Sequence, residues 1–437
     1  MNMNKEKVFQ DIYDAYVYAY PAVILELTKQ TFLNASKNEK PQKTNTYYHH
    51  TALADATFKN VVAPNIDTVY SQAFLDLREG ALLLEKPQLD RYVSITFLDA
   101  YTNCENYIGT GADGNQAKNY LITGPDFQGE VPEGYEQIAL PTNYAWSIIR
   151  TIIYGKDDIE KVKKIQEKLQ LKTYEGAKQE PLSQQYQPEL DYKPIEKITN
   201  LSLEEFFAIF NGLLAANPDK YAPKEKLKEW QKYGIGAGKT FTDDKEIRTV
   251  ALPVKEVFLK ATQRGQDYGV QRSGWSYSDF DIGVYKTNYL LRANVARNGL
   301  GANPINMCIY GAAYLDNQGA VLKGDKKYRI HFEKGQLPPV NEYGFWSLTL
   351  YDSKERYLVE NEIHRYGIND RDDLKKNEDG SIDILVQQKR PDEELVSNWL
   401  PTGEEEFNLV LRIYLTKEAV ISGEWNPPVI QEITEDK

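Results

Sequence analysis

Side chains that could recognise a ligand gather in a few short stretches of this 437-residue sequence. Amides, carboxylates and guanidinium groups suit hydroxyl-rich or anionic ligands, and flat aromatic rings stack on sugars. We therefore predict a site for a small hydroxyl-rich molecule, such as a glycan or a cell-envelope fragment. Its candidate binding residues are Asn65, Asp67, Tyr101, Asn103, Asn361, Arg365, Tyr366 and Trp399.

The same stretches permit two other interpretations. Asp67 acting with Arg365 or Tyr366 would make a metal-independent hydrolase or lyase, with these three as the candidate catalytic residues. Asn65 and Asp67 could instead only cap a bend, because Asx side chains commonly bond to nearby backbone in turns. The sequence leaves open whether the protein is an enzyme.

The sequence gives little support for a metal site or a nucleotide-binding loop. The four histidines are His49, His50, His331 and His364, and no His-x-His or Cys-x-x-Cys pair is present. We expect no metal site and no cofactor. Residues 234–240 read Gly-Ile-Gly-Ala-Gly-Lys-Thr, but the phosphate-binding pattern needs a glycine where Tyr233 stands and a preceding strand. This segment is predicted to be a turn that ends a helix.

The elements that must position these residues come in two copies. Residues 69–76 match 309–316, residues 94–99 match 347–352, and residues 150–154 resemble 412–415, in the same order. Three ordered matches indicate an internal duplication. Polar residues common to both copies should be structural, whereas those without a counterpart are freer to bind a ligand. The shared pairs are Asp76 and Asp316, Asp99 and Asp352, and Arg150 and Arg412.

Each copy alternates apolar and polar residues, which predicts short strands separated by turns. The fold class is therefore mainly β with a helical insert, α+β overall: two tandem jelly-roll-like antiparallel β-sandwiches joined by a helical segment. The predicted parts are an N-terminal helix and connection (1–40), a first sandwich (41–155), the helical region (156–303) and a second sandwich (304–437). Within them we expect a first helix broken at Pro21, an amphipathic helix after Ile159, a capping box from Ser202 to Glu205 and a helix from Tyr289 to Val295.

Several of these stretches resemble the tandem family of domains of unknown function 1254 and 1214. The resemblance implies a pair of jelly-roll-like sandwiches with a helical middle, and no established activity. Residues 64–70, 91–92, 101–103 and 107–110 carry it in the first copy, and residues 292–293, 335–339, 345–352, 365–366, 398–401 and 425–428 in the second.

Composition sets limits on partners. The net charge of −12 argues against non-specific binding to nucleic acid or anionic membranes. No run approaches the length of a membrane span and no signal peptide is visible, so we expect a soluble protein. It would be cytoplasmic as given, or periplasmic or secreted if a signal peptide had been removed. Because tandem jelly rolls can self-assemble, a structural homo-oligomer, a dimer or trimer, is a further alternative.

Overall fold

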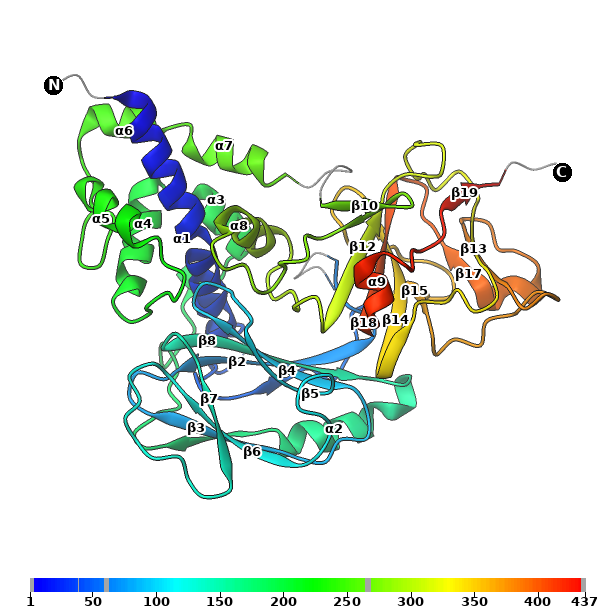
Figure 1. Ribbon diagram of the computed structural model, residues 1–437, viewed down its shortest axis with the longest axis horizontal. Helices are drawn as coiled ribbons and strands as arrows, with labels where there is room; N and C mark the ends of the chain where they lie inside the picture. Colours follow the sequence, from blue (N-terminus) through cyan, green and yellow to red (C-terminus); the bar gives the residue numbers. More distant parts are fainter. Residues whose placement is uncertain (1–3, 38, 59–62, 264–268, 434–437) are drawn as a thin grey trace.

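The computed structural model describes residues 4–37, 39–58, 63–263 and 269–433. It has three parts: a helical part and two β-sandwiches, which meet at the centre of the molecule (Figure 1). The predicted fold class is confirmed, because two β regions flank a helical segment.

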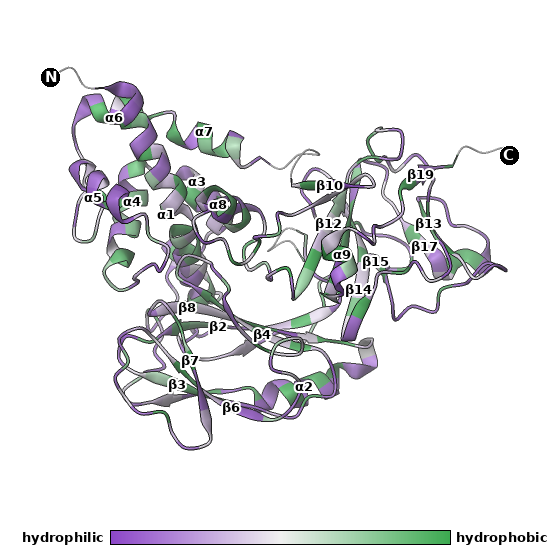
Figure 2. Ribbon diagram, in the orientation of Figure 1, coloured by the Kyte–Doolittle hydropathy of each residue, from purple (hydrophilic) through white to green (hydrophobic). Residues whose placement is uncertain are grey.

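The first sandwich packs a five-stranded sheet on a four-stranded sheet around an aliphatic core that includes Leu82, Ile95 and Ile149. The amphipathic helix predicted after Ile159 is α2 (Ile159–Lys168), which alternates hydrophobic and hydrophilic residues along its length (Figure 2). The five-stranded order is β1 (Tyr48–His49), β2 (Thr68–Asp76), β8 (Tyr144–Ile152), β4 (Val93–Asp99) and β5 (Asn106–Gly109); the four-stranded order is β7 (Tyr135–Ala139), β6 (Lys118–Thr123), β3 (Ala81–Lys86) and β9 (Leu171–Tyr174).

The second sandwich pairs a six-stranded sheet with a four-stranded one, and α9 (Glu418–Ser422) follows its last long strand. Its core includes Ile330, Leu348 and Leu411. The six-stranded order is β10 (Val270–Arg272), β11 (Trp275–Tyr277), β12 (Cys308–Ala313), β18 (Phe407–Thr416), β14 (Val340–Asp352) and β15 (Gly367–Asn369); the four-stranded order is β17 (Trp399–Pro401), β16 (Ile382–Gln387), β13 (Tyr328–Phe332) and β19 (Ile430–Glu432).

The predicted duplication is confirmed strand by strand. The order β2-β8-β4-β5 in the first sandwich recurs as β12-β18-β14-β15 in the second, and β7-β6-β3-β9 recurs as β17-β16-β13-β19. The registers agree as well: Arg150 stands opposite Tyr70 and Ser94, and its counterpart in the second copy stands opposite the equivalent tyrosine and serine, in the pairs Arg412–Tyr310 and Arg412–Ser347. Each copy departs from the expected antiparallel pattern at one place, a parallel edge pair.

The helical part is built around α1 (Lys5–Asn34). This helix continues through Pro21, so the predicted break there is wrong. A proline costs a helix one backbone hydrogen bond, but the residues around Pro21 are buried on every side and their packing holds the helix together. The helices that pack on α1 are α3 (Pro194–Asn200), α4 (Leu203–Leu214), α5 (Lys224–Trp230), α6 (Lys245–Ala251), α7 (Val254–Ala261) and α8 (Tyr289–Asn298).

Two features differ from the predicted boundaries. The N-terminal helix is the centre of the helical part and not a separate segment. Strands β9, β10 and β11, which fall in the region 156–303, belong to the sandwiches: β9 and β10 are edge strands, and β11 lies between β10 and β12. The capping box opens α4 as predicted, and Gly234 ends a short helical turn in a left-handed conformation, as expected for residues 234–240. Among the helices that the structure describes, none is both long and apolar enough to cross a membrane.

Candidate functional site

Three of the predicted site residues hold one loop of the second sandwich together. The Arg365 guanidinium donates to the backbone oxygens of Val396, Ser397 and Trp399 at 2.7 to 3.1 Å. Asn361 closes the turn before it, accepting from the Arg365 backbone N–H at 3.0 Å. Trp399 is buried, and its Nε1 donates to the Gln387 carbonyl at 2.8 Å. These contacts are local and structural.

Tyr366, Asn65 and Asp67 lie where the second copy meets the segment before β2. Tyr366 packs beside Ile66 in a small apolar cluster, and its hydroxyl donates to Glu360 at 3.2 Å. The Asn65 side-chain oxygen accepts from the backbone N–H groups of Asp67 and Thr68, so it does cap a bend, and its amide nitrogen donates to the Tyr414 hydroxyl. The segment is therefore both a turn and a contact between the copies.

Asp67 is a buried bridge between the two copies. One carboxylate oxygen accepts from Arg371 at 2.5 Å and the other from the Ser347 hydroxyl at 2.5 Å. Both partners belong to the second copy, whereas Asp67 directly precedes β2 of the first. The carboxylate is thus already occupied by a cation and a hydroxyl.

The shared arginines bridge the copies in a reciprocal way. Arg150 of the first copy donates to the Gly301 carbonyl, in the segment before β12, at 2.5 Å. Arg412 of the second copy donates to the Ala63 carbonyl, in the segment before β2, at 2.9 Å. Their predicted structural role is confirmed. Figure 1 shows the ends of β12, β14 and β18 lying against β2 and β4, where these contacts form.

Tyr101 and Asn103 follow β4 and belong to a different cluster. Asp99 ends the strand and accepts from the backbone N–H groups of both residues and from the Asn103 amide, at 2.8 to 2.9 Å. Between them, Thr102 is held at φ +70°, a left-handed conformation that a β-branched residue rarely adopts. Burial, together with the nearby charge of Asp219, raises the pKa of the Asp99 carboxyl to about 6. Backbone strain and a perturbed carboxyl together are typical of functional sites.

Arg292 of α8 is the centre of this cluster. Its guanidinium carbon lies 5.1, 5.4 and 5.2 Å from the ring centres of Tyr18, Tyr101 and Tyr289. Its ion pair with Asp219 is 3.3 Å long, and both side chains are at most 1% exposed. Asp219 also accepts from the Tyr18 hydroxyl at 2.9 Å. We call these residues the Arg292 cluster: Tyr18, Asp99, Tyr101, Asn103, Asp219, Tyr289 and Arg292.

Hydrogen-bonding capacity is left unused in and around this cluster. Buried polar atoms are nearly always paired, so unpaired ones in one neighbourhood require an explanation. Here four such atoms have no protein partner, each on a side chain that is almost wholly buried: Arg292 Nε, Asn103 Oδ1, Thr102 Oγ1 and Trp230 Nε1.

A groove of about 660 Å³ opens beside the Arg292 cluster, between α1, α5 and α8. Tyr289 lines the groove and also covers Arg292, and Trp230 lines it while its ring lies 5.8 Å from that of Tyr18. Its residues are Tyr13, Asp14, Val17, Pro223, Lys224, Glu225, Lys226, Trp230, Thr287, Asn288, Tyr289 and Leu290. Of the predicted site residues, only Tyr101 and Asn103 lie near the groove. They belong to the buried Arg292 cluster beside it and do not line the groove themselves.

Sequence reasoning missed most of this site. Arg292 entered only as part of the family resemblance, and Asp219, Tyr18 and Trp230 had no motif to mark them. The available signal was the N-cap at Asn288, which places Tyr289 and Arg292 on the first turn of a helix.

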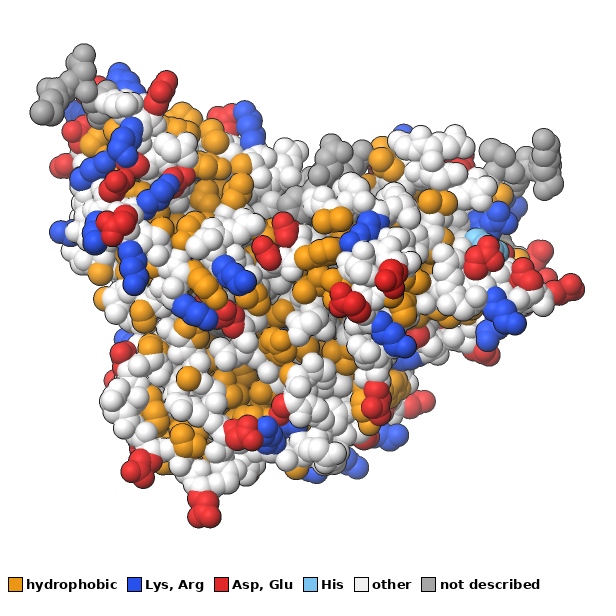
Figure 3. All heavy atoms as spheres, in the orientation of Figure 1, with side chains coloured by type: hydrophobic (Ala, Val, Ile, Leu, Met, Phe, Trp, Pro, Cys, Tyr) orange, Lys and Arg blue, Asp and Glu red, His pale blue; other side chains and the backbone are white. Residues whose placement is uncertain are grey.

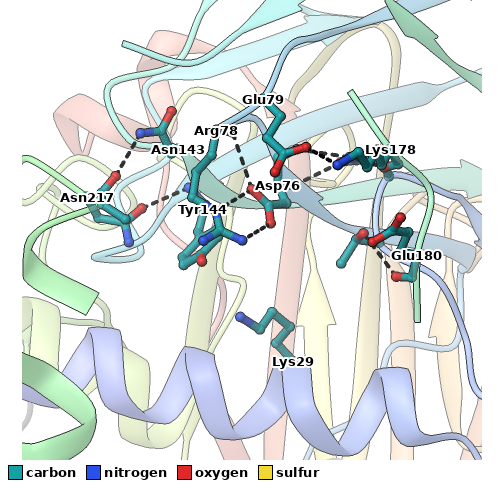
Figure 4. A network of polar contacts seen from close by, with 12 residues as sticks. Lys29, Asp76, Arg78, Glu79, Asn143, Tyr144, Lys178, Glu180 and Asn217 are labelled. Carbon is teal, nitrogen blue, oxygen red and sulfur yellow. Dashed lines mark hydrogen bonds and ion pairs between the residues drawn. The ribbon is translucent and has the colours of Figure 1, made fainter. Parts of the chain in front are cut away.

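A second polar network lies where α1 crosses the first sandwich (Figure 4). Tyr144 lies between two cations there, with Lys29 Nζ 4.5 Å and Arg78 Cζ 5.0 Å from its ring centre. Asp76 binds Arg78, as expected for a shared structural residue, and the Tyr144 backbone N–H donates to Asn217 at 2.8 Å. Every cation in this network has a carboxylate or a ring beside it, so we interpret it as a junction.

No three His, Cys, Asp or Glu side chains in the described part of the chain are arranged to hold a metal. His49 and His50 bond to Ser71 and Gln72, and burial lowers the pKa of both imidazoles. Cys104 and Cys308 are buried and not bonded to each other.

Two family models match this chain, each described as a protein of unknown function: DUF1254 over residues 44–173 and DUF1214 over residues 308–418. The chain therefore belongs to the family in which DUF1254 and DUF1214 domains occur in tandem, and each domain coincides with one copy of the duplicated sandwich. No curated protein matches it.

The chain is similar to the VPA0106 protein from Vibrio parahaemolyticus, whose crystal structure superposes with a TM-score of 0.70 at 21% identity, covering 98% of this chain and 100% of that one. A putative uncharacterised protein from Burkholderia cenocepacia gives a TM-score of 0.44 at 12% identity, over 98% of this chain and 93% of that one. The first likeness shows a shared fold.

Proposed function

We propose that this protein binds a hydroxyl-rich small molecule, such as a glycan fragment, in the groove between α1, α5 and α8. The observation that carries the proposal is the position of this groove directly beside the underpaired Arg292 cluster. A ligand there would contact Tyr289 and Trp230, which separate the groove from the buried arginine.

The groove's side chains suit sugar hydroxyls. Tyr13 and Tyr289 supply aromatic faces, and Asn288 and Thr287 can both donate and accept hydrogen bonds. Lys224 adds a donor, whereas the Asp14 carboxylate is already bonded to Gln10 and Lys226. Such a mixture of aromatic faces with a few polar groups is typical of small-molecule sites.

Binding is better supported than hydrolysis or elimination at Asp67. The Asp67 carboxylate is occupied by Arg371 and Ser347, and Arg365 is occupied by three carbonyls. A general base must reach a substrate proton, and a carboxylate held on both oxygens does so poorly. The hydrolase and lyase interpretation remains a hypothesis without a supporting contact.

A glycan array followed by calorimetric titration of each hit tests the proposal. Replacing Tyr13 by Ala removes a stacking face, and we expect binding to weaken about tenfold, or about 1.4 kcal/mol. Tyr135→Ala is the control, because this tyrosine is also half-buried and lies on β7 of the first sandwich, outside the groove. Absence of hits on the array, or equal affinities for Tyr13→Ala and the wild type, would contradict the groove as the site.

A further inference from the structure

Arg150 is a buried cation without a nearby carboxylate. Its residue is 4% exposed, and no Asp or Glu of the described chain lies within ion-pair distance of its guanidinium. Its hydrogen-bond partners are neutral: the Gly301 carbonyl at 2.5 Å and the Thr96 hydroxyl at 3.2 Å. A buried charge is costly unless it is paired, so this arginine carries positive charge that its protein surroundings leave without a countercharge.

The duplication provides an internal comparison. Arg412 occupies the same strand position in the second copy and is equally buried, at 5% exposed. Asp67 lies near enough to Arg412 to raise the pKa of its guanidinium, and the Tyr351 hydroxyl bonds to it at 2.9 Å. For Arg150 the largest contributions that raise its pKa come from tyrosines, and neither arginine has an Asp or Glu of the described chain within ion-pair distance. The two copies therefore share an arginine but differ in whether acidic charge accompanies it.

Neutral donors surround Arg150. Tyr70 stands opposite it on β2, with its ring centre 5.3 Å from the guanidinium carbon, and Tyr310 of the second copy lies close enough to raise the pKa of that group. Beside Tyr310, Asn303 is 1% exposed and both atoms of its side-chain amide lack a partner. Tyr70 and Tyr310 are half-buried, so the cluster is not sealed from solvent. These four residues, Tyr70, Arg150, Asn303 and Tyr310, form the Arg150 cluster.

We propose that the Arg150 cluster binds the oxyanion of a small molecule, a carboxylate or a phosphate, between the two copies. The guanidinium supplies the charge, the two tyrosine hydroxyls and the Asn303 amide supply further hydrogen bonds, and hydrogen bonds to an ionised group are roughly twice as strong as neutral ones. This site lies between the sandwiches and is independent of the groove in the helical part, so either proposal can fail without the other.

Thermal unfolding and calorimetric titration of the full chain test this site, with sodium phosphate and sodium acetate as probes and sodium chloride at matched ionic strength as the reference. We expect a saturable rise in the unfolding temperature with at least one probe beyond that in chloride. Tighter binding of phosphate would identify a tetrahedral oxyanion as the natural group, and tighter binding of acetate a carboxylate. Tyr310→Phe, which preserves the ring, should weaken binding at least tenfold.

Arg150→Gln should abolish the response, whereas Arg412→Gln, its counterpart in the second copy, should keep it. If Arg150→Gln does not fold, the anion response of Tyr310→Phe can be compared with that of Arg412→Gln instead. The first variant should bind more weakly and the second should keep the response. Two results would overturn the proposal: neither anion exceeds chloride, or Tyr310→Phe binds as tightly as the wild type.

Discussion

Asp99 is the residue whose titration should be visible in the stability of the whole fold. Burial raises its pKa to about 6 from the usual 3.8, so the folded protein holds a proton that the unfolded chain releases. The contribution of Asp99 to stability is then greatest below pH 4, falls as the pH rises from about 4 to 6, and is level above that range. A difference of about two pKa units corresponds to about 3 kcal/mol.

The Asp99→Asn variant isolates this contribution, because an amide does not titrate. Its Nδ2 can donate to Asn103 Oδ1, which has no partner in the wild type, once the Asn103 amide turns over. We expect the wild type to lose about 3 kcal/mol more than the variant between pH 4 and 7, as measured by urea unfolding at each pH. Parallel curves for the two proteins would show that Asp99 is ionised in the fold throughout.

For individual residues, the sequence predicted structural roles better than ligand-binding roles. Comparison of the two copies marked Arg412 and Asp76 as structural, and their contacts agree, since Arg412 donates to the Ala63 carbonyl and Asp76 binds Arg78. Arg150 makes the equivalent bridging contact but is also the centre of the proposed oxyanion site. The absence of a counterpart in the other copy predicted ligand binding less well. Asn361 and Arg365 occur only in the second copy, yet they bond within their own loop. A sequence does not show which polar atoms are already paired.

Among the elements, α8 links the groove to the Arg292 cluster and should be sensitive at its first turn. The Asn288 side chain caps it, accepting from the Leu291 backbone N–H at 3.2 Å. Replacing Asn288 by Ala should cost about 1 kcal/mol of stability and disorder the turn that carries Tyr289. Because Asn288 also lines the groove, the substitution removes a possible ligand contact as well. We therefore expect ligand affinity in the groove to fall together with stability, as measured by titration and urea unfolding.

Ser202→Ala is the control for the Asn288 variant. It removes the capping box of α4 and should cost a similar 1 kcal/mol, but α4 contributes no residue to the groove. Its affinity should equal that of the wild type. An equal loss of affinity in both variants would mean that groove binding reports general stability and not the position of α8.

Elements with strong local signals were predictable, and those made by long-range pairing were not. The capping box of α4 and the amphipathic α2 depend on residues three or four positions apart. Strand β9 (Leu171–Tyr174) is short and exists because β3, a strand far away in the sequence, pairs with it. The wrong break at Pro21 has the same origin, since the packing that supports α1 comes from helices about 200 residues away.

At the scale of the whole molecule, residues from distant segments bring the parts together. The helical part forms around α1 only when residues 194–298 fold onto it, and the Arg292 cluster takes side chains from α1, the end of β4 and α8. Figure 3 shows hydrophobic side chains gathered toward the middle of this face, where the three parts meet, with charged ones more often at the periphery. Because the site is assembled from distant segments, no single stretch of the sequence indicated it.

Asp67 should matter for the cohesion of the two copies more than for chemistry. Its side chain is fully buried, and it binds Arg371 and Ser347 of the other copy. Removing one partner of a buried ion pair costs about 3 to 5 kcal/mol, so Asp67→Asn should lower the free energy of unfolding by at least about 3 kcal/mol. Because the lost contacts join the copies, we expect calorimetry to show one transition for the wild type and a broadened or split transition for the variant.

Asp76→Asn provides the comparison, because its ion pair with Arg78 is partly exposed and should contribute less than about 1 kcal/mol. If Asp67 were catalytic, the opposite result would be expected: the Asp67→Asn protein would have normal stability but would no longer turn over its substrate. Unchanged stability in Asp67→Asn would therefore reject the bridge and return Asp67 to the candidate catalytic residues. A destabilised variant that still binds its ligand in the groove would place recognition in the helical part and cohesion between the sandwiches.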